Sequence, residues 1–240
     1  MTIILDDIKK MNDEKLLFEI AKNESDPTIR IAAARRLYNA EMLLHIVKTD
    51  KNMSVCEKVL KHLVFQIMFT EFRPRIIFED ENPFVEIALH SISPDMRRVA
   101  ADAVKSETAL LRLVNSDDAE IRRHVAKKIA NKDAICFFAR KDSDYEVRIL
   151  AIRKVTDEEV LADVALHDDE WRVRCEAVQR LTDEKILAKI AMKDKMNFVR
   201  YDAIKRMNDT TTLLHIAQNH DDYNCRSWAV TRLTDKRVFQ

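Results

Sequence analysis

A repeat of 26 residues constrains the fold of this chain more than any other feature of its sequence. The segment 156–181 reads TDEEVLADVALHDDEWRVRCEAVQRL and aligns without a gap with 182–207, TDEKILAKIAMKDKMNFVRYDAIKRM. When Arg174 is taken as slot 0, the equivalent residues are Arg30, Cys56, Arg97, Arg122, Arg148, Arg200 and Arg226. Five of the seven spacings between neighbours are 26 residues, one is 25 and one is 41. Such a period is typical of stacked-repeat proteins, so the sequence predicts eight repeats and one insertion.

Each repeat contains two short apolar patterns with helical spacing. In the repeat 182–207 they are Ile186, Leu187, Ile190 and Ala191, followed by Val199, Ala203, Ile204 and Met207. The patterns predict two short helices joined by a polar bend. Thr156 and Glu159 have the spacing of a capping box. The N-cap residues expected at equivalent places are Asn12, Thr182, Asn208 and Thr234.

The order of an aspartate, a Val-Arg pair, and then alanine and leucine on the second helix resembles the HEAT repeat. The likeness is greatest to the short form of the phycobilisome-lyase type, and lower to variant leucine-rich repeats. It extends over roughly residues 12–233, and the chain departs from it in having no glycine at the helix ends. The resemblance implies an all-α fold, a right-handed α–α superhelix (solenoid) of about eight helix pairs. In such a fold the second helices line the concave face.

A continuous repeat predicts one elongated domain over residues 1–240. Repeats occupy 12–63 and 79–233, an insertion occupies 64–78, and residues 1–11 and 234–240 are expected to act as caps. The insertion, VFQIMFTEFRPRIIF, is expected to lengthen a second helix until Pro74 ends it. Five of the ten phenylalanines lie between Phe65 and Phe84. They either repack a widened gap between two repeats or form an apolar docking patch.

Composition excludes several classes of function. Lys plus Arg and Asp plus Glu number 41 each, so net charge gives no general affinity for polyanions. The four cysteines are far apart, which indicates a reducing compartment and a cytoplasmic protein. No apolar run approaches the roughly 18 residues of a membrane span. No metal motif is present, and a chain without glycine cannot form the usual nucleotide-binding loops, so no cofactor is expected.

The arginine slot is predicted to be structural. Slots −1, +3, +4 and +7 around it are apolar, which places the arginine on the buried side of the second helix. Six residues before the slot lie Asp50, Asp142, Asp168 and Asp194. We expect an internal ladder in which each guanidinium bonds to carboxylates and carbonyls of the bend, as in HEAT-like repeats.

Slots +5 and +6 form a basic stripe. Its members are Arg35, Arg36, Lys61, Lys127, Lys128, Arg153, Lys154, Arg180, Lys205, Arg206 and Arg232. One interpretation is a groove for an acidic partner, either phosphate backbone or a carboxylate-rich peptide. The other is helix chemistry, because cations in the last turn of a helix complement its dipole.

Slot +2 contains Leu150, Glu176, Asp202 and Trp228 in consecutive repeats. The pair Asp202 and Trp228, edged by Arg180 and Arg206, is similar to the site of the HEAT-like alkylpurine DNA glycosylases. In those enzymes an acid and an aromatic ring hold a cationic base. The alternative is a solvated carboxylate beside an unrelated ring.

The sequence therefore predicts a non-catalytic HEAT-like scaffold that binds a protein or peptide partner, without a membrane or a small-molecule substrate. The alternative is nucleic-acid binding through the basic stripe, with alkylpurine DNA glycosylase activity as its enzymatic form. The candidate binding surface consists of Arg35, Arg36, Lys61, Lys127, Lys128, Arg153, Lys154, Arg180, Asp202, Lys205, Arg206, Trp228 and Arg232.

Overall fold

The described part of the chain is helical. The computed structural model describes residues 5–68, 82–91 and 93–238, and within these ranges it contains 17 α-helices and no strand. Consecutive helices pack in pairs, and within each of the two compact units each pair packs on the next, as expected of an α-solenoid. The predicted all-α repeat fold is thereby confirmed. None of the described helices is both long enough and apolar enough to cross a membrane.

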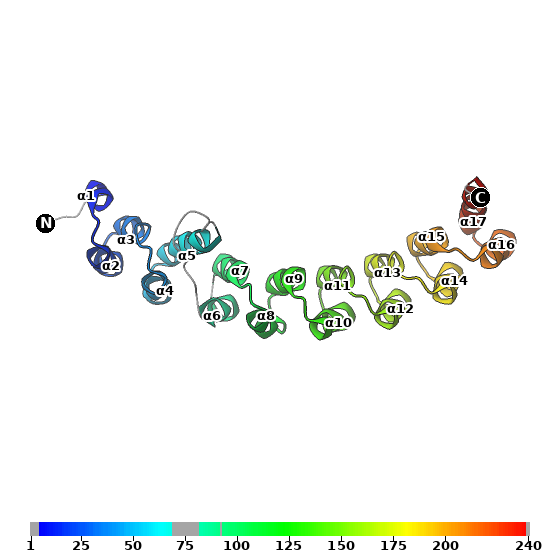
Figure 1. Cartoon of the computed structure of the whole chain (residues 1–240), viewed down its shortest axis with the longest axis horizontal. Coiled ribbons are helices and arrows are strands. Elements are labelled where there is room, and N and C mark those ends of the chain that lie inside the picture. The colour runs from blue at the N-terminus through cyan, green and yellow to red at the C-terminus, as the bar shows by residue number, and fades with distance from the viewer. Residues whose placement is uncertain (1–4, 69–81, 92, 239–240) are drawn as a thin grey trace. The chain divides into compact units, whose positions relative to one another are not determined.

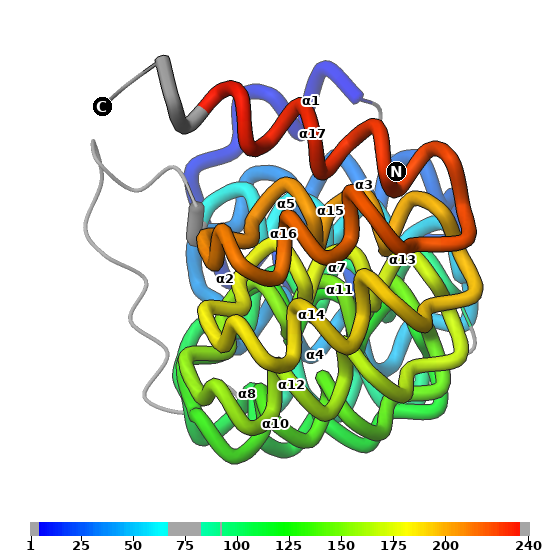
Figure 2. Tube along the Cα trace, turned by 90° about the vertical axis from the view of Figure 1, so that its right-hand side faces the viewer, coloured from blue at the N-terminus to red at the C-terminus, as the bar shows by residue number. Residues whose placement is uncertain are grey.

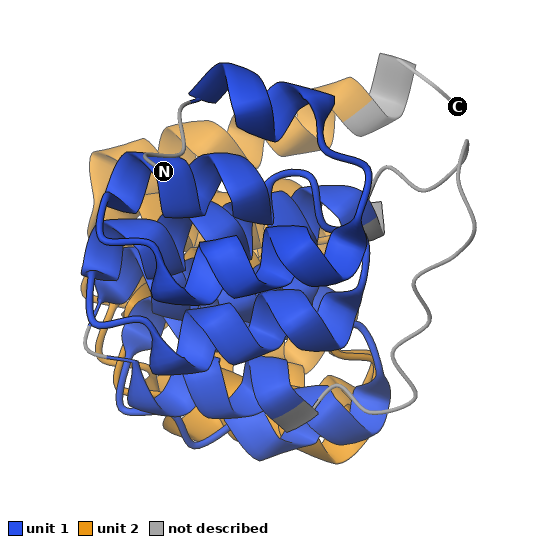
Figure 3. Cartoon of the chain, turned by 90° about the vertical axis from the view of Figure 1, so that its left-hand side faces the viewer, with its two compact units in different colours: residues 1–128 blue, residues 129–240 orange. Residues whose placement is uncertain are grey.

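The chain divides into two compact units, unit 1 (residues 1–128) and unit 2 (residues 129–240), as Figure 3 shows. In unit 1 the short helix α1 (Leu5–Lys10) packs on α3 and buries Ile8 (Figure 1). The helix pairs of unit 1 are α2 (Glu14–Asn23) with α3 (Pro27–Ala34), α4 (Ala40–Thr49) with α5 (Met53–Met68), α6 (Asn82–His90) with α7 (Pro94–Ala103), and α8 (Glu107–Leu113) with α9 (Ala119–Lys128). The prediction of a single domain over 1–240 stays a prediction.

Unit 2 contains four pairs in two layers. They are α10 (Lys132–Lys141) with α11 (Tyr145–Ile152), α12 (Glu158–His167) with α13 (Trp171–Val178), α14 (Glu184–Lys193) with α15 (Asn197–Arg206), and α16 (Thr210–Asn219) with α17 (Tyr223–Val238). The second helices α11, α13, α15 and α17 pack side by side in one layer, and α10, α12 and α14 pack in the other (Figures 1 and 2).

The apolar pattern of each repeat forms the core between the two layers. On α13 and just beyond it, Val173, Ala177, Val178 and Leu181 are fully buried, and the same slots are buried in the neighbouring repeats. Removing a Val or Leu side chain from water contributes roughly 1.5–3 kcal/mol. One pair buries only a few such residues, so neighbouring repeats must supply the rest of the burial.

The N-caps lie one residue later than predicted. Asp157, Asp183 and Asp209 cap α12, α14 and α16. Each accepts hydrogen bonds from the backbone N–H groups two and three residues later. Asp13 does the same for α2, so the predicted capping box of Thr156 and Glu159 and the predicted caps Asn12, Thr182 and Asn208 are wrong. Aspartate is the cap in place of the preceding Thr or Asn, because its carboxylate also complements the positive end of the helix dipole.

The predicted breaks in the repeat are partly visible. Helix α5 extends to Met68, longer than the other second helices of unit 1, as the insertion predicts. Val64 is buried there and Phe65 is exposed, whereas residues 69–81 lie outside the described residues. The tail does not begin a new repeat: Thr234 lies inside α17, where its hydroxyl donates to the Val230 carbonyl.

Candidate functional site

The slot 0 arginines form a buried ladder that joins successive repeats. All seven donate from Nη1 to the carbonyl of the residue six positions earlier, at 2.6–2.9 Å. Arg174 also donates from Nε and Nη2 to both carboxylate oxygens of Asp194, at 2.8 and 2.9 Å. Arg148 binds Asp168 in the same way. The ladder is confirmed, with one correction: the carboxylate comes from the following repeat, and the preceding bend contributes its carbonyl.

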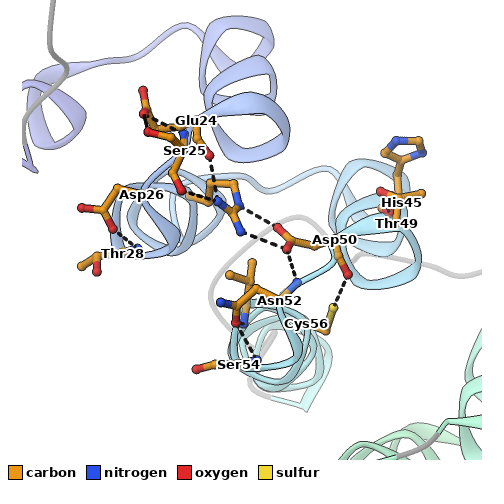
Figure 4. A network of polar contacts seen from close by, with 12 residues as sticks. Glu24, Ser25, Asp26, Thr28, His45, Thr49, Asp50, Asn52, Ser54 and Cys56 are labelled. Carbon is orange, nitrogen blue, oxygen red and sulfur yellow. Dashed lines mark hydrogen bonds and ion pairs between the residues drawn. The ribbon is translucent and has the colours of Figure 1, made fainter.

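Figure 4 shows one rung of this ladder around Asp50. Its carboxylate accepts from Arg30 at 2.8 and 3.0 Å and from the backbone N–H of Asn52 at 2.8 Å. Cys56, which replaces the arginine in this repeat, donates its thiol to the Asp50 carbonyl at 3.3 Å. Burial raises the pKa of this thiol. The rung is therefore a structural contact that joins the first two repeats.

The slot +6 cations form a second row, which the sequence did not reveal. Each reaches back to a carbonyl near the end of a helix in the preceding repeat, as Arg180 does to Val155 at 2.9 Å and Arg206 to Leu181 at 3.0 Å. The other members are Arg36 to Lys9, Lys128 to Ala101, Asp102 and Val104, Lys154 to Ile129, and Arg232 to Met207. These cations satisfy carbonyls left over at helix ends. Helix chemistry, one of the two expected interpretations, thus accounts for slot +6.

A third row joins slot +5 of one repeat to slot +2 of the next on the outer side of the second helices. Arg153 binds Glu176 with two hydrogen bonds of 3.0 and 3.1 Å, and Gln179 donates to Asp202 at 3.0 Å. In unit 1, Asp102 and His124 form the same kind of pair at 2.9 Å. We call this row the paired row. Asp202 is thus engaged by Gln179 and not by Arg180 or Arg206.

The paired row breaks at α15 and α17. Here slot +5 is Lys205 and slot +2 of the next repeat is Trp228, which offers no carboxylate. Lys205 lies instead over the ring of Tyr201, 5.9 Å from its centroid. Trp228 meets the same ring edge-on, with centroids 5.1 Å apart. Both positions belong to the predicted surface, and the polar contact of the paired row is replaced here by the ring contact between Tyr201 and Trp228.

Four rings from three consecutive second helices gather around this break. Besides Tyr201 and Trp228, Phe198 on α15 stacks on Trp171 of α13 at 5.5 Å, with 26° between the planes. Phe198 is 57% exposed and Tyr201 is 37% exposed. We call Trp171, Phe198, Tyr201 and Trp228 the aromatic band.

Arg172 and Lys205 provide the cations of the band. The Arg172 guanidinium lies 4.9 Å from the Trp171 ring and 5.8 Å from the Tyr145 ring of α11, and it binds Glu170 at 3.0 Å. Among the described residues no carboxylate lies within ion-pair distance of Lys205. The band therefore combines exposed rings with one cation, Lys205, that has a ring contact but no carboxylate partner among the described residues.

The sequence analysis missed Trp171, Arg172, Phe198 and Tyr201. They occupy slots −3, −2, −2 and +1, so reading the repeats column by column separates them. Arg35, Lys61 and Lys127 are exposed and belong to unit 1, whereas the band belongs to unit 2.

Burial raises the pKa of the three buried cysteines, Cys56, Cys175 and Cys225. Burial raises the pKa of the Cys175 thiol to about 12, and the neighbouring Asp202 carboxylate adds to the shift. All four cysteines are unpaired, and Cys56, Cys175 and Cys225 are buried. No group of three or more metal-binding side chains occurs within the described ranges. The arrangement is suited to binding a surface of another molecule.

Comparison with known proteins gives the fold alone. No protein-family model matches the chain, and no curated protein matches it. The crystal structure of YibA from E. coli resembles it with a TM-score of 0.50, over 96% of this chain and 95% of that one. The two sequences are 19% identical. The likeness supports a helical repeat fold along the chain.

Proposed function

We propose that this chain is a HEAT-like repeat protein that acts as a non-catalytic scaffold in the cytoplasm and binds a protein or peptide partner. The contact surface is the outer side of the second helices α13, α15 and α17, centred on the aromatic band. The four unpaired cysteines fit the reducing compartment of this proposal.

The exposure of the band is the observation that carries the proposal. Large aromatic side chains are normally covered, yet Phe198 and Tyr201 are exposed and meet two further rings. Tyr, Trp and Arg are the residues most enriched at the energetic centres of protein interfaces. They contribute there because large rigid rings exclude water at little cost in conformational entropy.

The break in the paired row supports the same surface. Elsewhere in unit 2, slots +5 and +2 bind each other, so their residue types have a structural cause. Lys205 and Trp228 do not form such a polar pair, and both contact the Tyr201 ring of the band. A partner that covers them would provide the missing contacts.

The nucleic-acid alternative has less support on this surface. Six cations of the basic stripe donate to helix-end carbonyls, and Arg153 is paired with Glu176. Glu170 and Glu176 place carboxylates beside the band, where a phosphate backbone would meet repulsion. A glycosylase would need Asp202 to leave Gln179.

The test is affinity capture from the native cytoplasm at low and high salt, with two matched double variants. Phe198→Ser with Tyr201→Ser removes the exposed rings of α15. Phe137→Ser with Leu214→Ser removes side chains of similar exposure, 45% and 50%, from the first helices.

We expect a protein that is captured at both salt concentrations to be lost only with the Phe198/Tyr201 double variant. If the partner still binds the Phe198/Tyr201 double variant but no longer binds the Phe137/Leu214 double variant, the binding surface lies on the first helices of the repeats. Unfolding midpoints of both variants control for damage to the fold.

A further inference from the structure

We infer that the aromatic band binds a proline-rich segment in the polyproline II conformation that carries an acidic residue opposite Lys205. This inference rests on the proposed function and names the chemistry of its partner. It follows from the spacing of the helices that carry the rings, the exposure of Phe198 and Tyr201, and a lysine, Lys205, that has no carboxylate partner among the described residues.

The spacing expected of the packed helices that carry the rings matches the repeat of a polyproline II helix. Packed helices lie about 8–10 Å apart, and the band takes its rings from α13, α15 and α17, three neighbours in one layer. A polyproline II helix has three residues per turn and a rise of about 3.1 Å, so it presents the same face about every 9 Å. A segment that crosses the second helices therefore meets a new helix with every turn.

Other peptide conformations fit this surface less well. An extended strand presents every second residue to one side, about 7 Å apart, and needs the edge of a sheet to pair with. The described residues contain no strand. An amphipathic helix inserts its apolar face into a groove between elements, whereas Phe198 and Tyr201 project from the middle of the layer on a single helix. Proline rings, in contrast, pack against exposed aromatic surfaces without further loss of backbone entropy.

The charges around the band indicate which residue the proline-rich segment carries besides proline. Glu176 and Asp202 are bound by Arg153 and Gln179, and Glu170 binds Arg172. Lys205 is exposed, and among the described residues it has a ring contact without a carboxylate. An acidic residue in the segment would complete the paired row at the one place in unit 2 where Trp228 interrupts it.

A single-stranded nucleic acid would also use rings and cations, but it needs open ring faces on which bases stack. The Trp171 ring already contacts Phe198 and Arg172, and the edge-on contact of Tyr201 and Trp228 fills the space between them. The carboxylates of Glu170 and Glu176 add repulsion for phosphates.

Both tryptophans of the chain lie in the band, so intrinsic fluorescence reports on it directly. The intact protein is titrated with three synthetic peptides of equal length. One repeats Pro-Pro-Glu, the second repeats Pro-Pro-Lys and the third repeats Gly-Ser-Glu. We expect the first to change the tryptophan emission saturably, the second to bind more weakly because it opposes Lys205, and the third to bind least because it must lose backbone entropy.

Four variants locate the contact. Tyr201→Ala should weaken Pro-Pro-Glu binding roughly tenfold or more, as expected for an aromatic residue at the centre of an interface. Lys205→Gln should weaken it roughly two- to fivefold, the effect of one exposed ion pair, and Lys205→Arg should restore it. Lys189→Gln, an exposed lysine on α14, should change nothing. If the Tyr201→Ala variant does not fold, the comparison of Lys205→Gln, Lys205→Arg and Lys189→Gln still tests the contact.

Three results would overturn the inference. Equal binding of the Gly-Ser-Glu peptide would show that the polyproline II conformation is not required. Tighter binding of the Pro-Pro-Lys peptide would show that the acidic residue is not recognised. Tighter binding of oligouridine than of any peptide would make the band a nucleic-acid surface. If no peptide binds, while a captured partner still depends on Phe198 and Tyr201, the proline-rich segment is wrong and the proposed function stands.

Discussion

The same residue type has different roles in this chain because burial and partners differ between slots. The Arg174 and Asp194 side chains are only 10% and 7% exposed, and Arg174 makes two further hydrogen bonds to bend carbonyls. The hydrogen bonds to Asp194 raise the pKa of this guanidinium above its ordinary value. Arg153 makes an equally good pair with Glu176, but its side chain is 57% exposed. Water and salt screen the second pair and leave the first almost intact.

Replacing Arg174 by Leu should therefore lower the free energy of unfolding by about 2–4 kcal/mol, because Asp194 and the bend carbonyls lose their donor. Arg153→Leu should cost less than about 1 kcal/mol. Urea unfolding of both variants measures the difference. Equal costs would show that the ladder is no more stabilising than a surface pair, and loss of partner binding in a stable Arg174→Leu would make slot 0 a binding row.

At the level of helices, the repeats are linked end to end by glutamates as well as arginines. Glu184, the first residue of α14, accepts the backbone N–H groups of Asn208 and Asp209 at the start of the next repeat. Glu158 does the same for Thr182 and Asp183. The starts of α14 and α16 are thereby held by their own N-caps and by the preceding repeat.

Asp157→Ala should cost about 1 kcal/mol of stability, because Asp157 caps α12 and accepts the N–H groups of Glu159 and Val160. Thr156→Ala should cost less than about 0.5 kcal/mol, since the structure shows no cap at this exposed residue. Thermal unfolding of the two variants distinguishes the cap seen in the structure from the capping box expected from the sequence. A larger cost for Thr156→Ala would favour the capping box.

The periodic features were predictable and the contacts between repeats were not. Helix pairs and buried arginines follow from which side of one helix is apolar, so the sequence alone predicts them. The partner of Arg174 required knowing which neighbouring bend lies within reach, and the sequence analysis chose the wrong carboxylate. The aromatic band was missed for a related reason: Trp171 and Phe198 lie at different slots and meet only when α13 and α15 pack.

For the whole molecule, part of the charge of the 41 basic and 41 acidic residues is engaged in these links between repeats. Slot +6 cations hold helix-end carbonyls, and glutamates hold the starts of the following helices. Equal numbers of basic and acidic residues give no net attraction for a distant polyanion, and the acidic helix starts oppose the basic stripe.

Duplex DNA should therefore bind weakly at every salt concentration. A groove that neutralised six or more phosphates would lose roughly a thousandfold in affinity between 50 and 200 mM salt. We expect no such steep response, because the exposed stripe cations without a helix-end carbonyl are few. Titration of a labelled duplex at both salts measures the slope, and Arg35, Lys61 and Lys205 changed together to Gln serve as the comparison, since they leave the carbonyl contacts intact. Submicromolar binding at 200 mM salt that these three changes abolish would overturn the scaffold proposal. Excision of an alkylated base in the same assay, lost in Asp202→Asn, would establish the glycosylase in its place.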